Sequence, residues 1–141
     1  DGDSVLKQIV GVYNKYQCSV VAIEEVPIDQ TDKYGIIAGD LVDGTNDTYR
    51  VTDMVEKPNS KDAPTNMAII GRYILTPDIF NILRSIAPGK GGEIQITDAL
   101  LILAKQGKVV AYNFKGKRFD CGSIEGYLEA THYFAKKQGV L

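Results

Sequence analysis

Two apolar runs joined by a polar turn decide the fold: Ile36-Ile-Ala-Gly-Asp-Leu-Val42, then Asp43-Gly-Thr-Asn-Asp47, then Tyr49-Arg-Val-Thr-Asp-Met-Val55. Asp, Gly and Asn between two β-prone runs are typical of a hairpin turn. The segment therefore predicts two antiparallel strands. Because side chains alternate along a strand, we expect two faces on the second one: Tyr49, Val51, Asp53 and Val55 on one side, and Arg50, Thr52 and Met54 on the other.

Outside this hairpin, short β-branched runs alternate with segments of helical periodicity. Strands are expected at 18–26, 67–75 and 109–114, and helices at 5–13, 79–86, 99–106 and 124–138. Hydroxyl residues that precede the helices are candidate caps: Ser4, Thr76, Thr97 and Ser123. Alternating strands and helices predict an α/β domain, and the hairpin makes its sheet mixed.

The composition is that of one ordinary globular domain. The chain has 141 residues, of which 44% are hydrophobic and 24% charged, and its formal net charge is -2. This charge gives no global basic field for nucleic acid or an anionic membrane. No apolar run approaches the ~20 residues of a membrane helix. No secretory signal opens the sequence, so we expect a cytoplasmic protein whose two cysteines are buried thiols.

The segment Val55-Glu56-Lys57-Pro58 ends the second hairpin strand with a carboxylate beside an ammonium group. A carboxylate accepts hydrogen bonds from sugar hydroxyls, and an ammonium neutralises a phosphate oxygen. Successive strand residues point to opposite faces, so Glu56 and Lys57 reach one ligand only if the chain bends there. Pro58 favours such a bend. The alternative is a solvated charge pair at a strand end.

A second polar segment, Phe119-Asp120-Cys121-Gly122, precedes the last helix, at the edge where open α/β sheets usually hold ligands. Asp120 is a candidate Mg²⁺ ligand, because Mg²⁺ takes one or two carboxylates plus substrate phosphates. Its alternative is an Asx-type turn or a helix cap. Gly35 either lets the backbone approach a sugar ring or is a simple turn glycine. We expect Glu56, Lys57 and Asp120 to converge on one cleft.

Five segments, in this order, resemble the C-terminal half of the bacterial UTP–glucose-1-phosphate uridylyltransferases (UDP-glucose pyrophosphorylases). Each segment is weak evidence alone, but their order and spacing together are specific. The resemblance covers essentially the whole chain, and Asp-Cys-Gly indicates the glucose-1-phosphate uridylyl branch. The segments are Tyr34-Gly35, Val55-Glu56-Lys57-Pro58, Ala68-Ile-Ile-Gly-Arg-Tyr73, Gly92-Glu-Ile-Gln-Ile-Thr-Asp98 and Phe119-Asp120-Cys121-Gly122.

This resemblance implies a Rossmann-like three-layer α/β/α nucleotidyltransferase fold with a mixed sheet, incomplete at the N-terminal side. Residues 1–141 would be the C-terminal, sugar-phosphate-binding half of a single domain. The implied enzyme transfers a uridylyl group from UTP to glucose 1-phosphate, with Mg²⁺, giving UDP-glucose and pyrophosphate. The matched motifs imply that Glu56 binds glucose hydroxyls, Lys57 the sugar-phosphate oxygens and Asp120 the Mg²⁺. Gly35 and Ile69 would complete the sugar pocket, and Lys57 and Asp120 are the catalytic candidates.

The family's Gly-rich nucleotide loop, uracil-binding segment and other metal-binding Asp have no counterpart in the sequence. We therefore expect the isolated chain to be inactive. A broken sheet edge and exposed apolar surface should make it self-associate, so a homo-oligomer is expected. The expected partners are small molecules, glucose 1-phosphate and UTP, and neither nucleic acid nor a membrane. Two alternatives stay open: a thymidylyl-, cytidylyl- or adenylyltransferase, or a non-catalytic regulatory or assembly module of the same fold.

Overall fold

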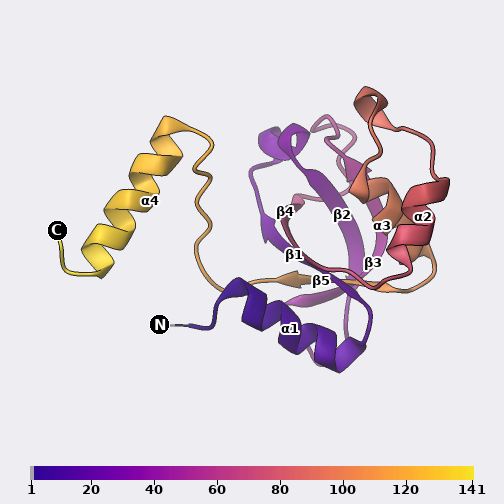
Figure 1. Cartoon of the computed structure of the whole chain (residues 1–141), viewed down its shortest axis with the longest axis horizontal. Helices are drawn as coiled ribbons and strands as arrows, with labels where there is room; N and C mark the ends of the chain where they lie inside the picture. Colours follow the sequence, from indigo (N-terminus) through magenta and orange to yellow (C-terminus); the bar gives the residue numbers. More distant parts are fainter. Residues whose placement is uncertain (1) are drawn as a thin grey trace.

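A computed structural model describes residues 2–141, without the side chain of Lys90. The described residues form five strands and four α-helices, with two short 3₁₀ turns between them (Figure 1). The elements are α1 (Val5–Tyr16), β1 (Ser19–Glu25), η1 (Ile28–Lys33), β2 (Gly35–Leu41), β3 (Thr48–Glu56), β4 (Met67–Ile74), α2 (Ile79–Ser85), η2 (Lys90–Gly92), α3 (Ile96–Lys105), β5 (Val109–Asn113) and α4 (Ile124–Lys137).

The sheet is mixed, as the hairpin predicts. Its strands follow the order β1-β4-β2-β3-β5, and β5 returns to pair with β1, so the described strands close a ring. The β1–β5 pairing is parallel and the other pairings are antiparallel. The broken sheet edge expected from the sequence is therefore wrong for the described strands, because each of them has two neighbours.

Strand β1 lies between two helical layers, and its sequence shows why. Val20 and Ala22 pack toward α1, while Val21 and Ile23 belong to the cluster that contains α3. All four side chains are almost fully buried. A strand that is covered on both faces needs an unbroken apolar run, and residues 20–23 supply one. The helices and the sheet thus form three layers.

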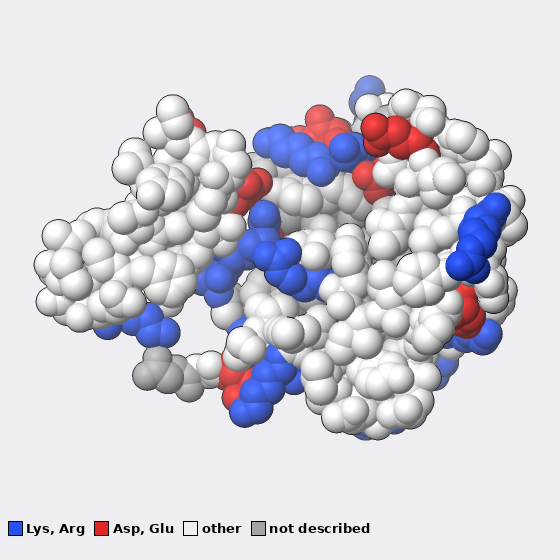
Figure 2. All heavy atoms as spheres, in the orientation of Figure 1, with Lys and Arg blue, Asp and Glu red and all other residues white. Residues whose placement is uncertain are grey.

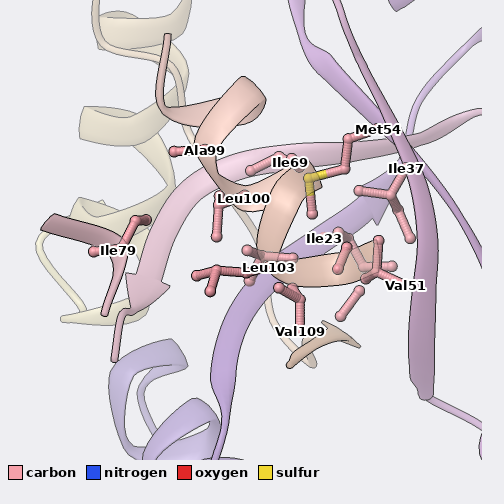
Figure 3. Packing of buried hydrophobic residues seen from close by; sticks show 13 residues of the cluster. Ile23, Ile37, Val51, Met54, Ile69, Ile79, Ala99, Leu100, Leu103 and Val109 are labelled. Atoms are coloured by element: carbon pink, nitrogen blue, oxygen red, sulfur yellow. The ribbon is translucent and has the colours of Figure 1, made fainter. Parts of the chain in front are cut away.

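The larger core lies between the sheet and helix α3 (Figure 3). Leu100 and Leu103 of α3 are fully buried there against Ile23, Val51 and other strand residues. Burying one such side chain contributes roughly 1.5–3 kcal/mol. This packing fixes the N-terminal end of α3 relative to the ends of the neighbouring strands.

A β-bulge in β3 overturns the alternation expected from the sequence. Ala38 pairs with Asp53 while Gly39 pairs with Val51, so Thr52 is an extra residue. Val51 and Met54 therefore enter the same core cluster, although strict alternation predicts opposite faces. A Cβ on Gly39 would lie 2.5 Å from the carbonyl oxygen of Arg50, so the close approach of the two backbones depends on this glycine.

Helix α4 stands apart from the rest of the fold (Figure 1). The ring of Phe119, in the segment that precedes α4, lies 5.1 Å from that of Tyr133 and 5.8 Å from that of Phe134. Much of the apolar surface of α4 is exposed to solvent: Ile124 is 77% exposed and Leu128 60% exposed. Among the described residues, no helix is long and apolar enough to span a membrane.

Candidate functional site

Strand register brings three of the predicted sugar-site residues together. Gly35, the first residue of β2, lies directly opposite Glu56, the last residue of β3. In the next strand, Ala68 of β4 pairs with Ile36, which places Ile69 beside the same strand ends. Gly35 lies close to both other residues: a Cβ added to it would lie 3.2 Å from Glu56 Oε2 and 3.4 Å from Ile69 Cδ1.

Thr97 completes this cluster. Its hydroxyl donates a hydrogen bond of 2.5 Å to Glu56 Oε2, and its Oγ1 would also lie 3.2 Å from a Cβ on Gly35. The sequence predicts Thr97 as a helix cap, and that interpretation is wrong. Helix α3 begins at Ile96 with Gln95 as its N-cap, and the side chain of Gln95 makes no capping bond. No local pattern reveals Thr97, because its partner lies 41 residues away in the chain.

The bulge in β3 determines where Glu56 points. Beyond Thr52 the strand resumes its alternation, so Met54 and Glu56 share a face. Met54 lies in the core cluster with Ala99 and Leu100 of α3. Glu56 is therefore directed toward the N-terminal end of α3, where Thr97 lies. Without the extra residue, the alternation that buries Val51 would turn Glu56 to the opposite face.

The bend expected after Glu56 is present. Lys57 has a left-handed backbone with φ 46°, and its N–H donates to the carbonyl oxygen of Tyr34 at 2.9 Å. A positive φ is uncommon for a residue other than glycine and often marks a functional position. As a result, Glu56 and Lys57 line one hollow of about 280 Å³, together with Gly91, Glu93 and Gln95. This size is close to the lower end for small-molecule sites.

Tyr73 of β4 is electrostatically coupled to this region. Burial raises the pKa of its phenol, and the negative charge of Glu56 raises it further. Both effects disfavour the phenolate, so the phenol stays protonated at neutral pH. Tyr73 belongs to the segment of the sequence that carries the family resemblance. The sequence alone does not show that its phenol lies near Glu56; the fold brings the two side chains together.

Asp120 lies in a different hollow from Glu56 and Lys57. It lines a space of about 370 Å³ with Arg72, Lys117 and Arg118 among its neighbours. The expected convergence of all three charged residues on one cleft is therefore not what the structure shows. Figure 2 shows blue Lys and Arg side chains gathered between α4 and the rest of the molecule, where the chain crosses toward α4.

Asp120 is held in place by a turn and by α4. Its Oδ1 accepts a hydrogen bond of 3.0 Å from the N–H of Gly122, which is the Asx-type turn considered as an alternative role. Gly126 allows the close approach to the helix, since a Cβ there would overlap the carbonyl oxygen of Asp120.

The two cysteines are not buried as expected. Cys121 is exposed and Cys18 only partly buried, so the expectation of two buried thiols is wrong.

Arg118 connects the Asp120 segment to the sugar-site strands. Its Nε forms a short ion pair with Glu24 of β1, and its Nη2 donates to the hydroxyl of Tyr34 at 3.0 Å. The guanidinium also lies 5.4 Å from the centre of the Tyr34 ring. Tyr34 immediately precedes Gly35, so the Arg118 side chain joins the Asp120 segment to the start of β2.

The described residues offer one carboxylate rather than a closed metal cage. No group of three or more His, Cys, Asp or Glu side chains among them could hold a metal ion. The turn at Asp120 engages Oδ1 through Gly122. Mg²⁺ usually keeps several waters and takes one or two carboxylates together with substrate phosphates, and Asp120 could supply one such carboxylate.

The architecture itself defines a class: a three-layer α/β/α domain with a mixed sheet, whose polar side chains gather at the strand ends. The chain belongs to the nucleotidyl transferase family, whose model matches residues 3–137.

Curated relatives and a solved structure narrow this further. The chain is 62% identical to a UTP–glucose-1-phosphate uridylyltransferase of Pseudomonas aeruginosa over 133 residues, which are 94% of this chain and 47% of that protein. It is 41% identical over 128 residues to a putative enzyme of the same name from Methanocaldococcus jannaschii, covering 91% of this chain and 44% of that protein. A structure of UDP-glucose pyrophosphorylase complexed with UDP-glucose matches with TM-score 0.91 and 58% identity, over 97% of this chain and 51% of that one. The chain spans about half the length of the curated relatives it matches.

Proposed function

We propose that the full-length protein containing these residues transfers a uridylyl group from UTP to glucose 1-phosphate, giving UDP-glucose and pyrophosphate. In this proposal, residues 1–141 supply the half of the domain that binds the sugar phosphate. The observation that carries it is the placement of Glu56 and Lys57 on one hollow at the end of β3. The names of the similar proteins and the UDP-glucose in one solved neighbour support the choice of substrates.

The chemistry asks this chain mainly for position and charge. An oxygen of the sugar phosphate attacks the α-phosphorus of UTP in line, and pyrophosphate leaves. The ammonium of Lys57 would bind and neutralise the phosphate of glucose 1-phosphate, while the carboxylate of Glu56 accepts hydrogen bonds from the glucose hydroxyls. Gly35 and Ile69 would shape the wall of the sugar pocket, because a Cβ on Gly35 would lie close to both Glu56 and Ile69.

Asp120 would hold the Mg²⁺ in this proposal. When it is bound, the ion neutralises phosphate charge. The chain's own contribution is to present one carboxylate from a turn that Gly122 and Gly126 permit. The remaining ligands would come from the substrate phosphates, from water and from the half of the protein that lies outside this chain.

Three further expectations remain proposals. The isolated chain should not turn over UTP, and UDP-glucose formed by the purified chain would contradict this. The chain should form homo-oligomers, which the exposed Ile124 and Leu128 of α4 support; a monomer in light scattering at high concentration would count against it. A cytoplasmic location rests on the sequence alone, and cell fractionation tests it.

The proposal is tested by steady-state kinetics of the full-length protein with Glu56→Ala and Lys57→Ala. Each variant should raise the KM for glucose 1-phosphate or lower kcat/KM at least about tenfold, because each removes a charged hydrogen-bonding partner. Glu25→Ala and Lys15→Ala are matched controls, since both side chains are exposed at other places on the surface. Unchanged kinetics in both site variants would favour a non-catalytic module.

The nucleotide is a separate question, because the residues that read the base lie outside this chain in the proposed arrangement. Comparing the turnover of UTP with that of dTTP, CTP and ATP by the full-length protein separates the uridylyltransferase from the other sugar-1-phosphate nucleotidyltransferases. We expect UTP to be the preferred substrate by kcat/KM.

A further inference from the structure

The hydrogen bond between Thr97 and Glu56 is unusual for its place in the fold. Thr97 is only 5% exposed and lies in the first turn of α3, yet its hydroxyl donates to a carboxylate at the end of β3 rather than capping its own helix. The bond crosses above Gly35, whose missing Cβ leaves room for both oxygens. Three elements therefore meet at one carboxylate.

A carboxylate on a flexible Glu side chain must be ordered before it can select a sugar hydroxyl. Fixing such a side chain costs rotamer entropy. In this fold the Glu56 side chain is already ordered before any sugar binds, because the buried core sets the position of α3 and Thr97 then holds Glu56 Oε2. The negative charge also lies near the N-terminal end of α3, where the helix dipole favours it.

We propose that Thr97 is a positioning residue for sugar recognition: its hydroxyl holds Oε2 of Glu56, so that Oε1 is presented to a sugar hydroxyl in the adjacent hollow. This inference rests on the proposed function of Glu56. It adds a requirement that the role of Glu56 alone does not contain, namely that the residue at position 97 must carry a hydroxyl. A purely structural Thr97 would need only its shape.

The test compares Thr97→Val with Thr97→Ser in the full-length protein. Valine keeps the shape and removes the donor, whereas serine keeps the donor and removes the methyl group. We expect Thr97→Val to weaken the binding of glucose 1-phosphate about tenfold in calorimetry and to raise its KM to match, with the KM for UTP within about twofold of the wild type. Thr97→Ser should stay within about threefold of the wild type. Thermal melting checks that each variant is folded.

The outcomes separate this inference from the proposed function. Wild-type affinity for glucose 1-phosphate in Thr97→Val, together with weakened affinity in Glu56→Ala, would overturn the role of Thr97 and leave the function standing. Unchanged affinity in both Glu56→Ala and Lys57→Ala would overturn the function itself. Should Thr97→Val fail to fold, Thr97→Ala removes the same donor without adding bulk. Loss of binding in a folded Thr97→Ser protein would also overturn the inference.

Discussion

Replacing Gly35 with alanine probes the candidate sugar site with a single methyl group. The new Cβ would lie 3.2 Å from both Glu56 Oε2 and Thr97 Oγ1, and 3.4 Å from Ile69 Cδ1. The first two distances are tighter than ordinary van der Waals contact, so the carboxylate must move by a few tenths of an ångström. Gly35 does not have a positive φ, so alanine adds no backbone strain. The overlap should cost about 1 kcal/mol of stability, the lower end for overpacking, because the end of a Glu side chain can shift.

The functional loss should be larger than the loss of stability. A displaced Glu56 forfeits a hydrogen bond between a charged group and the sugar, worth about 1.5–3 kcal/mol, or roughly tenfold to a hundredfold in kcat/KM for glucose 1-phosphate. The assay is steady-state kinetics of the full-length protein with either substrate varied. Gly11→Ala is the control, since a Cβ there meets nothing within 4 Å. A folded Gly35→Ala enzyme with wild-type kcat/KM would refute this reasoning.

Three other substitutions test structural features on which the site depends: the bulge in β3, the packing of Asp120 against α4 and the core around α3. Gly39→Ala should destabilise the protein by about 1–3 kcal/mol in urea unfolding, because its Cβ meets the carbonyl oxygen of Arg50 at the bulge; an unchanged midpoint would argue against the bulge. Gly126→Ala should displace Asp120 and raise the Mg²⁺ concentration needed for half-maximal rate by about tenfold, and an unaltered Mg²⁺ titration would contradict that coupling. Leu103→Ala, at a fully buried position, should cost about 3–5 kcal/mol, and a loss under about 1 kcal/mol would show that the core is packed differently.

The elements of this fold could be predicted from local patterns, but the closure of the sheet could not. The unbroken apolar run in β1 indicates a strand covered on both faces, and Ser4 and Ser123 do cap their helices. The hairpin of β2 and β3 is also as predicted. The parallel pairing of β1 with β5 joins segments about 90 residues apart, and no pattern within either strand specifies that partner.

The candidate site shows the same division. Glu56 and Lys57 could be selected from their chemistry at a strand end, and the bend between them from Pro58. The direction of Glu56 could not, because it depends on the extra residue Thr52, and a bulge has no reliable signature in a single sequence. The role of Thr97 could not be predicted for a related reason. A Thr before a helical run fits the pattern of a helix cap, and only the tertiary structure shows that its hydroxyl bonds to Glu56.

The capture of sugar phosphate at the end of β3 is the central claim, and a crystal structure of the full-length protein with glucose 1-phosphate tests it most directly. The account predicts sugar hydroxyls within hydrogen-bonding distance of Glu56, the phosphate against Lys57, and the bond between Thr97 and Glu56 intact. A hexose bound elsewhere, with Glu56 and Lys57 contacting only solvent, would contradict it.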